Sequence, residues 1–288
     1  MRNRSAFIGR LLAVILAFAG SAAISPQGMA ADPAIRVGMI PDAGATQVSI
    51  EQKAPLRDHL AKATGLNVEL IIPTNYNATV EALGNGSLDF AYLGGLTYVI
   101  AHEKYGVVPM VQRESDLQFH SLFITQTGSS IKSLADLKGK NFAYGDIVST
   151  SGHLMPYAAL TKAGIDSDKD MKSRYTGSHP ATAKAVESGT VDAGAMDESV
   201  YQAMIADGSL DKSRVRVFYT TPPFLDYVWV ARKDVSAAAR QKFEAAFLAL
   251  QKGRDDKVLE ILRGTKFIRA NDALYNDLRK IAKELKLF

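Results

Sequence analysis

Short apolar runs alternate with amphipathic segments along most of the chain, beginning near residue 35. Apolar runs bounded by Gly, Pro, Asn or Asp are typical of buried strands, whereas apolar residues that recur every three or four positions are typical of helices. The predicted strands are 35–40, 68–72, 88–93, 107–111, 121–125, 141–144, 173–176, 191–196, 215–219 and 228–231. The predicted helices are 50–63, 78–83, 96–105, 152–163, 181–188 and 198–206, and a further short segment lies at 133–137.

This alternation favours an α/β fold built from mixed, mostly parallel sheets flanked by helices. The C-terminal region differs, because its pattern is helical. Two apolar faces carry that prediction, namely Phe243, Ala246, Phe247 and Leu250 on one helix and Leu274, Leu278, Ile281 and Leu285 on the last one. Two α/β halves without a long Gly/Ser linker indicate two lobes that share a cleft. Ligands in such folds bind beyond the C-terminal ends of strands, where helix N-termini converge.

The first thirty residues have the pattern of a secretory signal peptide. Residues 1–10 are basic, residues 11–24 form an apolar stretch, and Gly28-Met29-Ala30 supplies small residues at a cleavage position. A membrane anchor would need about 20 apolar residues, and this stretch has 14. We therefore expect an exported protein whose mature chain begins at Ala31, with Asp32 as the second choice.

Charge and composition exclude several functions. Of the 34 basic residues, three lie in residues 1–30, which contain no acid, so the rest of the chain has 31 bases against 30 acids. A nearly neutral body of mixed sign has no electrostatic surface for nucleic acid. The chain has no cysteine, which excludes a thiol nucleophile, a disulfide framework and a Cys-ligated zinc site. We expect no cofactor and no metal.

The sharpest local signal lies where the predicted strand 141–144 leads to a helix through Ser149, Thr150, Ser151 and Gly152. The first turn of a helix leaves backbone N–H groups unpaired and carries partial positive charge. Hydroxyl groups beside it can add donors for an oxyanion without any Lys or Arg. The alternative is that one of the three hydroxyls simply caps the helix, and spacing alone favours capping.

Further candidates lie at other element ends. His179 precedes a predicted helix, Tyr76 follows the second strand, Tyr92 precedes Gly94-Gly95, and His120 precedes the strand 121–125. Asp226 follows Pro222-Pro223 and would ordinarily be a solvated turn acid. Asp197 and Glu198 begin a helix, where acids suit the helix dipole. Taken singly, each of these residues has an ordinary structural explanation.

Taken together, the segments resemble one family. Tyr76-x-x-Thr79-Val-Glu-Ala-Leu-x-x-Gly86-x-Leu-Asp89-Phe-Ala-Tyr-Leu-Gly-Gly, Ser149-Thr-Ser-Gly, Thr176-Gly-Ser-His179 and Val191-Asp-Ala-Gly-Ala follow in order within residues 35–232. They resemble the phosphate/phosphite/phosphonate solute-binding family, which are periplasmic receptors of ABC importers. Family members often have Tyr where this chain has Gln118-Phe119-His120. At the position aligned with the acid of aminoalkylphosphonate receptors, this chain has Ser199.

The resemblance implies a type II periplasmic-binding-protein-like fold with the ligand between two lobes. Lobe 1 would comprise residues 31–115 and about 225–288, and lobe 2 about 116–224. Ser149, Thr150, Ser151 and His179 would hold the phosphorus oxygens. Tyr76 would reach in from lobe 1, and Asp226 would accept a proton from the ligand and so discriminate against sulfate. The site set implied is Tyr76, Tyr92, His120, Ser149, Thr150, Ser151, His179 and Asp226, with no catalytic and no metal-binding residue.

The resemblance also implies the partners, an inner-membrane permease of an ABC importer and a small phosphorus oxyanion, bound by a periplasmic monomer. The departure at Ser199 favours phosphite or methylphosphonate over aminoethylphosphonate, but the sequence does not rank phosphite, phosphate and methylphosphonate. Two alternatives stay open. One is a secreted serine hydrolase with a Ser149, His179 and Asp226 triad, although no G-x-S-x-G motif surrounds Ser149. The other is a ligand-sensing partner of a membrane kinase.

Overall fold

A computed structural model describes residues 34–42 and 50–286 of the chain. The expected signal peptide at residues 1–30 and its cleavage position lie outside the described residues. Within the described part, no helix combines the length and the apolar character that crossing a membrane requires.

Strands lie within two residues of every strand that the sequence predicts, and one further strand lies near the C-terminus. The first lobe contains β1 (Ile35–Met39), β2 (Val68–Ile71), β3 (Phe90–Leu93), β4 (Val108–Arg113), β10 (Val228–Ala231) and the unpredicted β11 (Phe267–Arg269). The second lobe contains β5 (Ser121–Gln126), β6 (Asn141–Tyr144), β7 (Lys172–Tyr175), β8 (Ala193–Asp197) and β9 (Val215–Thr220).

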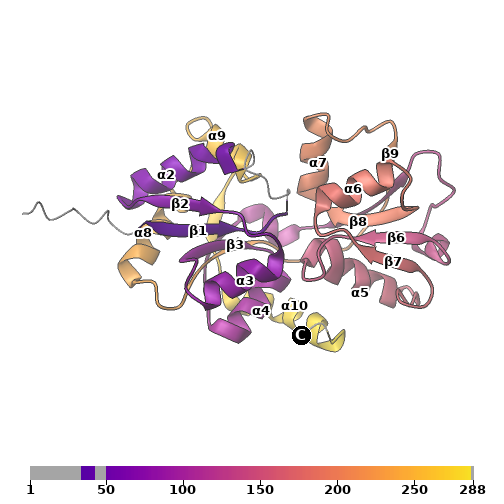
Figure 1. The fold of residues 1–288 in the computed structure, drawn as a ribbon, viewed down its shortest axis with the longest axis horizontal. Coiled ribbons are helices and arrows are strands. Elements are labelled where there is room, and N and C mark those ends of the chain that lie inside the picture. The colour runs from indigo at the N-terminus through magenta and orange to yellow at the C-terminus, as the bar shows by residue number, and fades with distance from the viewer. Residues whose placement is uncertain (1–33, 43–49, 287–288) are drawn as a thin grey trace, which may run out of the picture. The chain divides into compact units, whose positions relative to one another are not determined.

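The helices of the first lobe are α2 (Ala54–Thr64), α3 (Tyr76–Gly84), α4 (Gly95–Tyr105), α8 (Ala237–Leu248), α9 (Asp256–Ile261) and α10 (Asn276–Glu284). Those of the second lobe are α5 (Met155–Lys162), α6 (His179–Glu187) and α7 (Glu198–Ala206), shown beside their sheet in Figure 1. Short turns are η1 (Glu114–Gln118), η2 (Leu134–Leu137), η3 (Thr150–Leu154) and η4 (Asp272–Tyr275). Gly65 ends α2 in the left-handed region at φ +69°, which glycine adopts without a steric cost.

Each lobe is organised around one mixed sheet. The strand order is β11-β4-β10-β3-β1-β2 in the first lobe and β7-β6-β8-β5-β9 in the second. The expectation of mostly parallel sheets is wrong, because only four of the nine pairings between described strands are parallel. The parallel pairs follow helical crossovers within one sheet. In contrast, β10 arrives from the other lobe and inserts antiparallel between β3 and β4, as β5 does between β8 and β9.

Two segments connect the lobes, one between β4 and β5 and the other between β9 and β10. They are held together by an isolated antiparallel bridge in which Phe119 and Phe224 exchange two backbone hydrogen bonds of 2.9 Å. Asp226 lies on the second segment, and its N–H donates to the carbonyl of Asp116 on the first at 3.1 Å. The position of Asp226 is therefore set by the connection between the lobes.

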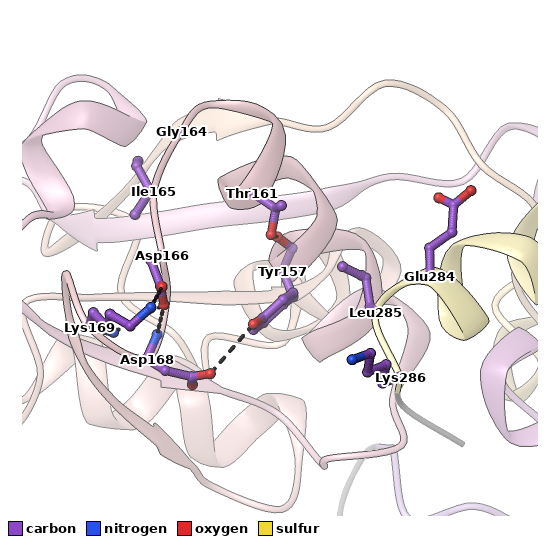
Figure 2. Close-up of a pocket in the computed structure, with 10 residues that line it drawn as sticks. All are labelled: Tyr157, Thr161, Gly164, Ile165, Asp166, Asp168, Lys169, Glu284, Leu285 and Lys286. Atoms are coloured by element: carbon purple, nitrogen blue, oxygen red, sulfur yellow. Dashed lines mark hydrogen bonds and ion pairs between the residues drawn. The ribbon is translucent and has the colours of Figure 1, made fainter.

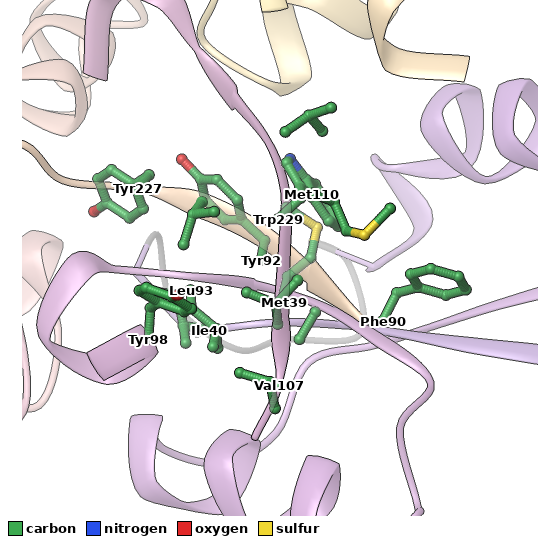
Figure 3. Close-up of a cluster of buried hydrophobic side chains, with 14 of the residues drawn as sticks. Met39, Ile40, Phe90, Tyr92, Leu93, Tyr98, Val107, Met110, Tyr227 and Trp229 are labelled. Carbon is green, nitrogen blue, oxygen red and sulfur yellow. The ribbon is translucent and has the colours of Figure 1, made fainter. Parts of the chain in front are cut away.

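The core of the first lobe combines aliphatic side chains with a group of neighbouring aromatic rings (Figure 3). Trp229 is fully buried, and its ring centroid lies 4.8 Å from that of Phe247 and 5.1 Å from that of Tyr92. The second lobe has two smaller apolar clusters. The predicted apolar face of the last helix is partly wrong, because Leu274 lies in the turn η4 before α10 and is 49% exposed, whereas Leu278 is buried.

Candidate ligand-binding site

The candidate site is formed where helix starts from both lobes meet. The Oγ1 of Thr150, in the second lobe, accepts a hydrogen bond of 2.9 Å from the N–H of Leu96 in the first turn of α4. The hydroxyl of Tyr76, the first residue of α3, lies 3.5 Å from Nε2 of His179, the first residue of α6. The structure thereby brings together residues that are up to 103 positions apart in the sequence.

The three hydroxyl residues after β6 have three different roles. Ser149 caps the turn, since its Oγ accepts the N–H of Gly152 at 3.0 Å. Thr150 bonds to the other lobe, and the buried Oγ of Ser151 has no hydrogen-bond partner in the described structure. Capping therefore accounts for one hydroxyl out of three.

The helix that the sequence predicts from residue 152 begins earlier, with a wide π-type turn at Thr150–Leu154 in which Leu154 N–H donates to the Ser149 carbonyl at 3.0 Å. Gly152 is needed in this turn because of close contacts. A Cβ at position 152 would lie 2.9 Å from Ser149 Oγ and 3.0 Å from the His179 ring. The absence of a side chain at Gly152 lets the turn of residues 149–152, called the hydroxyl turn, and the imidazole of His179 approach each other.

His179 is held in one tautomer by the backbone. The N–H of Asp197 can only donate, and it lies 3.3 Å from Nδ1 of His179, so the neutral ring carries its proton on Nε2. Burial lowers the pKa of His179, which favours this neutral form. The imidazole therefore directs an N–H donor toward Tyr76 and the hydroxyl turn.

Asp226 is fully buried and is the acceptor of the group. Its Oδ1 accepts the N–H of Gly95 at 2.9 Å, and its Oδ2 has no hydrogen-bond partner among the described residues. Burial raises the pKa of Asp226 to about 8, although hydrogen bonds from Gly95 and Thr150 favour the ionised form. The raised pKa makes this carboxyl a good proton acceptor, and once it has taken up a proton it can also donate a hydrogen bond.

Two of the predicted residues have other partners. The ring of His120 donates from Nδ1 to the carbonyl of Thr221 at 2.7 Å, and its backbone N–H donates to Glu198 at 2.9 Å. Tyr92 stacks on Tyr227 with ring centroids 4.9 Å apart, and its buried hydroxyl has no partner in the described structure. The hydroxyl turn thus contacts His179 and Asp226, and Tyr76 reaches it through His179, whereas no described contact brings His120 or Tyr92 to it.

Two acids beside the site, Asp146 and Asp197, were not assigned to it from the sequence. Asp146 accepts the backbone N–H of Tyr76 from the opposite lobe, which suits the positive end of α3. Asp197 caps α7 as expected, but it also accepts a hydrogen bond of 2.6 Å from the hydroxyl of Tyr227. An acid after a strand is a weak signal, and nothing local to Asp146 or Asp197 shows that the other lobe supplies a partner.

A depression outside the candidate site lies between α5, the loop after it and the end of α10 (Figure 2). It has a volume of about 500 Å³ and is lined by Tyr157, Asp168, Lys169 and Glu284 among others. Tyr157 lies 3.5 Å from Asp168, and Lys169 pairs with Asp166 at 2.7 Å. Three acids and two lysines line this depression, so it does not favour an anion.

Comparison with known proteins decides the family. Residues 37–275 match the family described as ABC transporter, phosphonate, periplasmic substrate-binding protein. The chain belongs to this family. The resemblance noted from the sequence is thereby confirmed, as is a periplasmic transport role at the level of the family.

Among the relatives is the probable ABC transporter phosphite binding protein PhnD1 of Prochlorococcus marinus, which is 30% identical over 267 residues, covering 87% of this chain and 89% of the relative. The phosphate-import protein PhnD of Mycolicibacterium smegmatis is 27% identical over 250 residues, or 81% of this chain and 78% of that protein. Both relatives are transport proteins by name.

The solved structure of P. marinus PhnD1 in complex with methylphosphonate superimposes with a TM-score of 0.82 at 29% identity, covering 88% of this chain and 99% of that one. The aliphatic sulphonate binding protein SsuA of Escherichia coli shares the fold alone, with a TM-score of 0.63 at 21% identity over 88% of each chain. The two mixed sheets flanked by helices are thus the type II periplasmic-binding-protein fold, as expected from the sequence.

Proposed function

We propose that this receptor binds a small phosphorus oxyanion, a phosphonate or phosphite and possibly phosphate, between its lobes and delivers it to the permease of an ABC importer. The observation that carries the proposal is a buried hydroxyl and a buried carboxylate oxygen that have no partners among the described residues, near the imidazole that bridges the lobes. Ser151 Oγ and Asp226 Oδ2 are buried and without partners among the described residues, and His179 directs an N–H donor between the lobes. The methylphosphonate complex of PhnD1 supports the ligand class.

The chemistry of the proposed site suits an oxyanion that brings a proton. Hydroxyl and imidazole donors of the second lobe would hold the ionised oxygens, and hydrogen bonds to charged groups contribute roughly 1.5–3 kcal/mol each. Asp226 can share one proton with the ligand, carried by either partner. A phosphonate or phosphite can bring that proton to the ionised carboxyl, whereas sulfate brings none, and the repulsion between sulfate and the ionised carboxyl is the basis of the proposed selectivity.

Closure of two lobes on the ligand follows from the same contacts. We assign residues 31–115 and about 225–288 to lobe 1 and about 116–224 to lobe 2, because the two connections lie near residues 115 and 225. The bonds of Thr150 to Leu96 and of Asp146 to Tyr76 cross from one lobe to the other. A ligand that touches both lobes stabilises the closed form by its higher affinity for that form.

The hydrogen bonds of the His179 imidazole argue against the hydrolase alternative. In a Ser-His-Asp triad, Nδ1–H donates to the carboxylate and Nε2 accepts from the serine. Here Nδ1 of His179 accepts from the Asp197 N–H, and Oδ1 of Asp226 accepts from Gly95. We therefore propose a non-catalytic receptor that works without cofactor or metal, as a monomer, after removal of residues 1–30.

Calorimetric titration of the chain from Ala31 with methylphosphonate, phosphite and phosphate tests the proposal. We expect one site per chain, with at least one of the three anions bound at least tenfold more tightly than sulfate. Failure of all three anions to bind would overturn the proposed ligand class. Covalent labelling of Ser149 by a fluorophosphonate probe would instead support the hydrolase.

A further inference from the structure

The second residue after helix α9, Arg263, has an unusual backbone conformation. Gly264 N–H donates to the Leu259 carbonyl at 3.1 Å and Arg263 N–H to the Glu260 carbonyl at 3.0 Å, which is the pattern of a Schellman motif. The left-handed position in this motif is usually glycine, yet here it is Arg263, with φ +50°. A side chain is thus kept at a position where it is sterically unfavourable, which directs attention to what that side chain contacts.

The guanidinium of Arg263 connects the two lobes. It pairs with the carboxylate of Asp42 in the first lobe, and its Nε donates to Ser199 Oγ, in the second, at 3.2 Å. Ser199 Oγ in turn donates to Oδ1 of Asp197 at 2.7 Å, and the N–H of Asp197 bonds to His179. A continuous path of hydrogen bonds therefore runs from Arg263 to the imidazole of the proposed site.

The same guanidinium borders a groove outside the site. Arg263 and Ser199 line this groove, which has a volume of about 660 Å³ and includes Phe119 and Glu198. The side chain of Arg263 is 18% exposed, whereas Asp197 and His179 are fully buried. Arg263 thus lies between the groove and the buried donors. It contacts Asp42 directly, and Ser199 links it to the second carboxylate, Asp197.

We infer that Arg263 determines which phosphorus anions are accepted, because its guanidinium occupies the space and neutralises the carboxylates that a longer, cationic ligand substituent would otherwise meet. With Arg263 in place, the site accepts a small substituent and excludes a longer one. Without it, Asp42 loses the guanidinium that pairs with it, and an ammonium group on the ligand can take the place of that cation. The inference rests on the proposed function.

The test uses Arg263→Gly, which removes the side chain and suits the left-handed backbone, and three ligands. These are methylphosphonate, 2-aminoethylphosphonate and propylphosphonate. The propyl substituent has the length of the aminoethyl substituent but lacks its ammonium group. We expect the wild-type protein to bind methylphosphonate at least tenfold more tightly than either longer ligand. In Arg263→Gly the affinity for 2-aminoethylphosphonate relative to methylphosphonate should rise at least tenfold. The affinity for propylphosphonate relative to methylphosphonate should rise less.

Two further variants serve as controls. Arg263→Lys retains a cation and should leave the ratio near that of the wild type. Ser199→Ala removes the bond across the lobes but keeps the guanidinium, so it should weaken all three ligands to a similar degree. An unchanged ratio in Arg263→Gly, with methylphosphonate still bound, would overturn the role of Arg263 alone. Failure of the wild-type protein to bind methylphosphonate, phosphite and phosphate would instead overturn the proposed function.

Discussion

The two lobes contribute to the proposed site in different ways. The second lobe supplies side-chain donors that are close together in the sequence, Ser149 to Ser151 after β6 and His179 after β7. The first lobe supplies backbone N–H groups of Gly95 and Leu96, and the connection between the lobes supplies Asp226. Donors of the second lobe are thus local features, whereas the acceptor exists only because distant segments are packed together.

The three hydroxyl residues of the second lobe should therefore differ in their effects on ligand binding and on the stability of the fold. Ser151 Oγ makes no internal hydrogen bond in the described structure, so its loss should affect the ligand alone. Ser149 and Thr150 also hold the fold, one by capping its own turn and the other by bonding to Leu96. Substitutions that change one of these contributions at a time therefore separate the two lobes experimentally.

The largest effect is expected from Gly152→Val, which disrupts the second-lobe donors together. A Cβ at position 152 would lie within 3.0 Å of both Ser149 Oγ and the His179 ring, so the turn and the imidazole must separate. Binding of methylphosphonate should fall more than 100-fold by calorimetry. Gly128→Ala is the matched control, because a Cβ there meets no atom within 4 Å, and it should bind normally. Near-normal binding by Gly152→Val would show that the donors do not act together.

The second effect concerns Asp226 and pH. The carboxyl and the ligand need one shared proton, and burial raises the pKa of Asp226 to about 8. Affinity of the wild-type protein should therefore fall as pH rises above 8, by up to about tenfold per pH unit. Asp226→Asn should flatten this dependence and narrow the gap between phosphite and sulfate, since an amide also donates. The exposed Asp168→Asn is the control. A slope that survives in Asp226→Asn would assign the proton to another group.

Stability of the ligand-free protein should depend on the same carboxyl. Because the folded-state pKa of Asp226 lies above that of the unfolded chain, the folded state binds more protons between about pH 4 and pH 8. This contribution to the free energy of unfolding is therefore complete below about pH 4 and is lost as pH rises to about 8. Urea denaturation of the wild type and of Asp226→Asn across this range measures it, and parallel curves for the two proteins would contradict the assignment.

A smaller, tenfold effect is expected from Ser151→Ala. Losing one hydrogen bond to a charged ligand costs roughly 1.5–3 kcal/mol, which weakens binding about tenfold or more, while the melting temperature should stay unchanged. Ser149→Ala should differ, because loss of a cap lowers the free energy of unfolding by about 0.5–2 kcal/mol. The exposed Ser130→Ala serves as the control for both. Equal destabilisation by Ser149→Ala and Ser151→Ala would remove the distinction between cap and ligand donor.

The smallest signal is the change of shape on binding. A ligand held by both lobes should lower the radius of gyration in solution scattering and raise the melting temperature, by about 2.7 kcal/mol of added stability at 100 times Kd. An unchanged scattering curve at saturation would indicate a site within one lobe, and would remove the first lobe from the comparison.

The order of strands and helices could be predicted from the sequence because it depends on local periodicity. Buried strands such as Phe90–Leu93 and Val228–Ala231 are apolar and short. The hydroxyl residues that begin at Ser149 are a local signal for the start of a helix. Strand direction was not predicted correctly, because β10 and β5 reach their sheets from the other lobe, and no local pattern records that path.

The elements and the family could thus be read from the amino-acid sequence, and the donors could be proposed from it, since each depends on residues that are close together in the chain. The burial of Asp226 and the contacts of Arg263, in contrast, depend on the tertiary structure. An acid after two prolines is ordinarily solvated, and only packing between the lobes buries it and raises its pKa. Arg263 follows a short helix, and its partners Asp42 and Ser199 are 221 and 64 positions away, so their contact depends on the folded arrangement and not on local propensity.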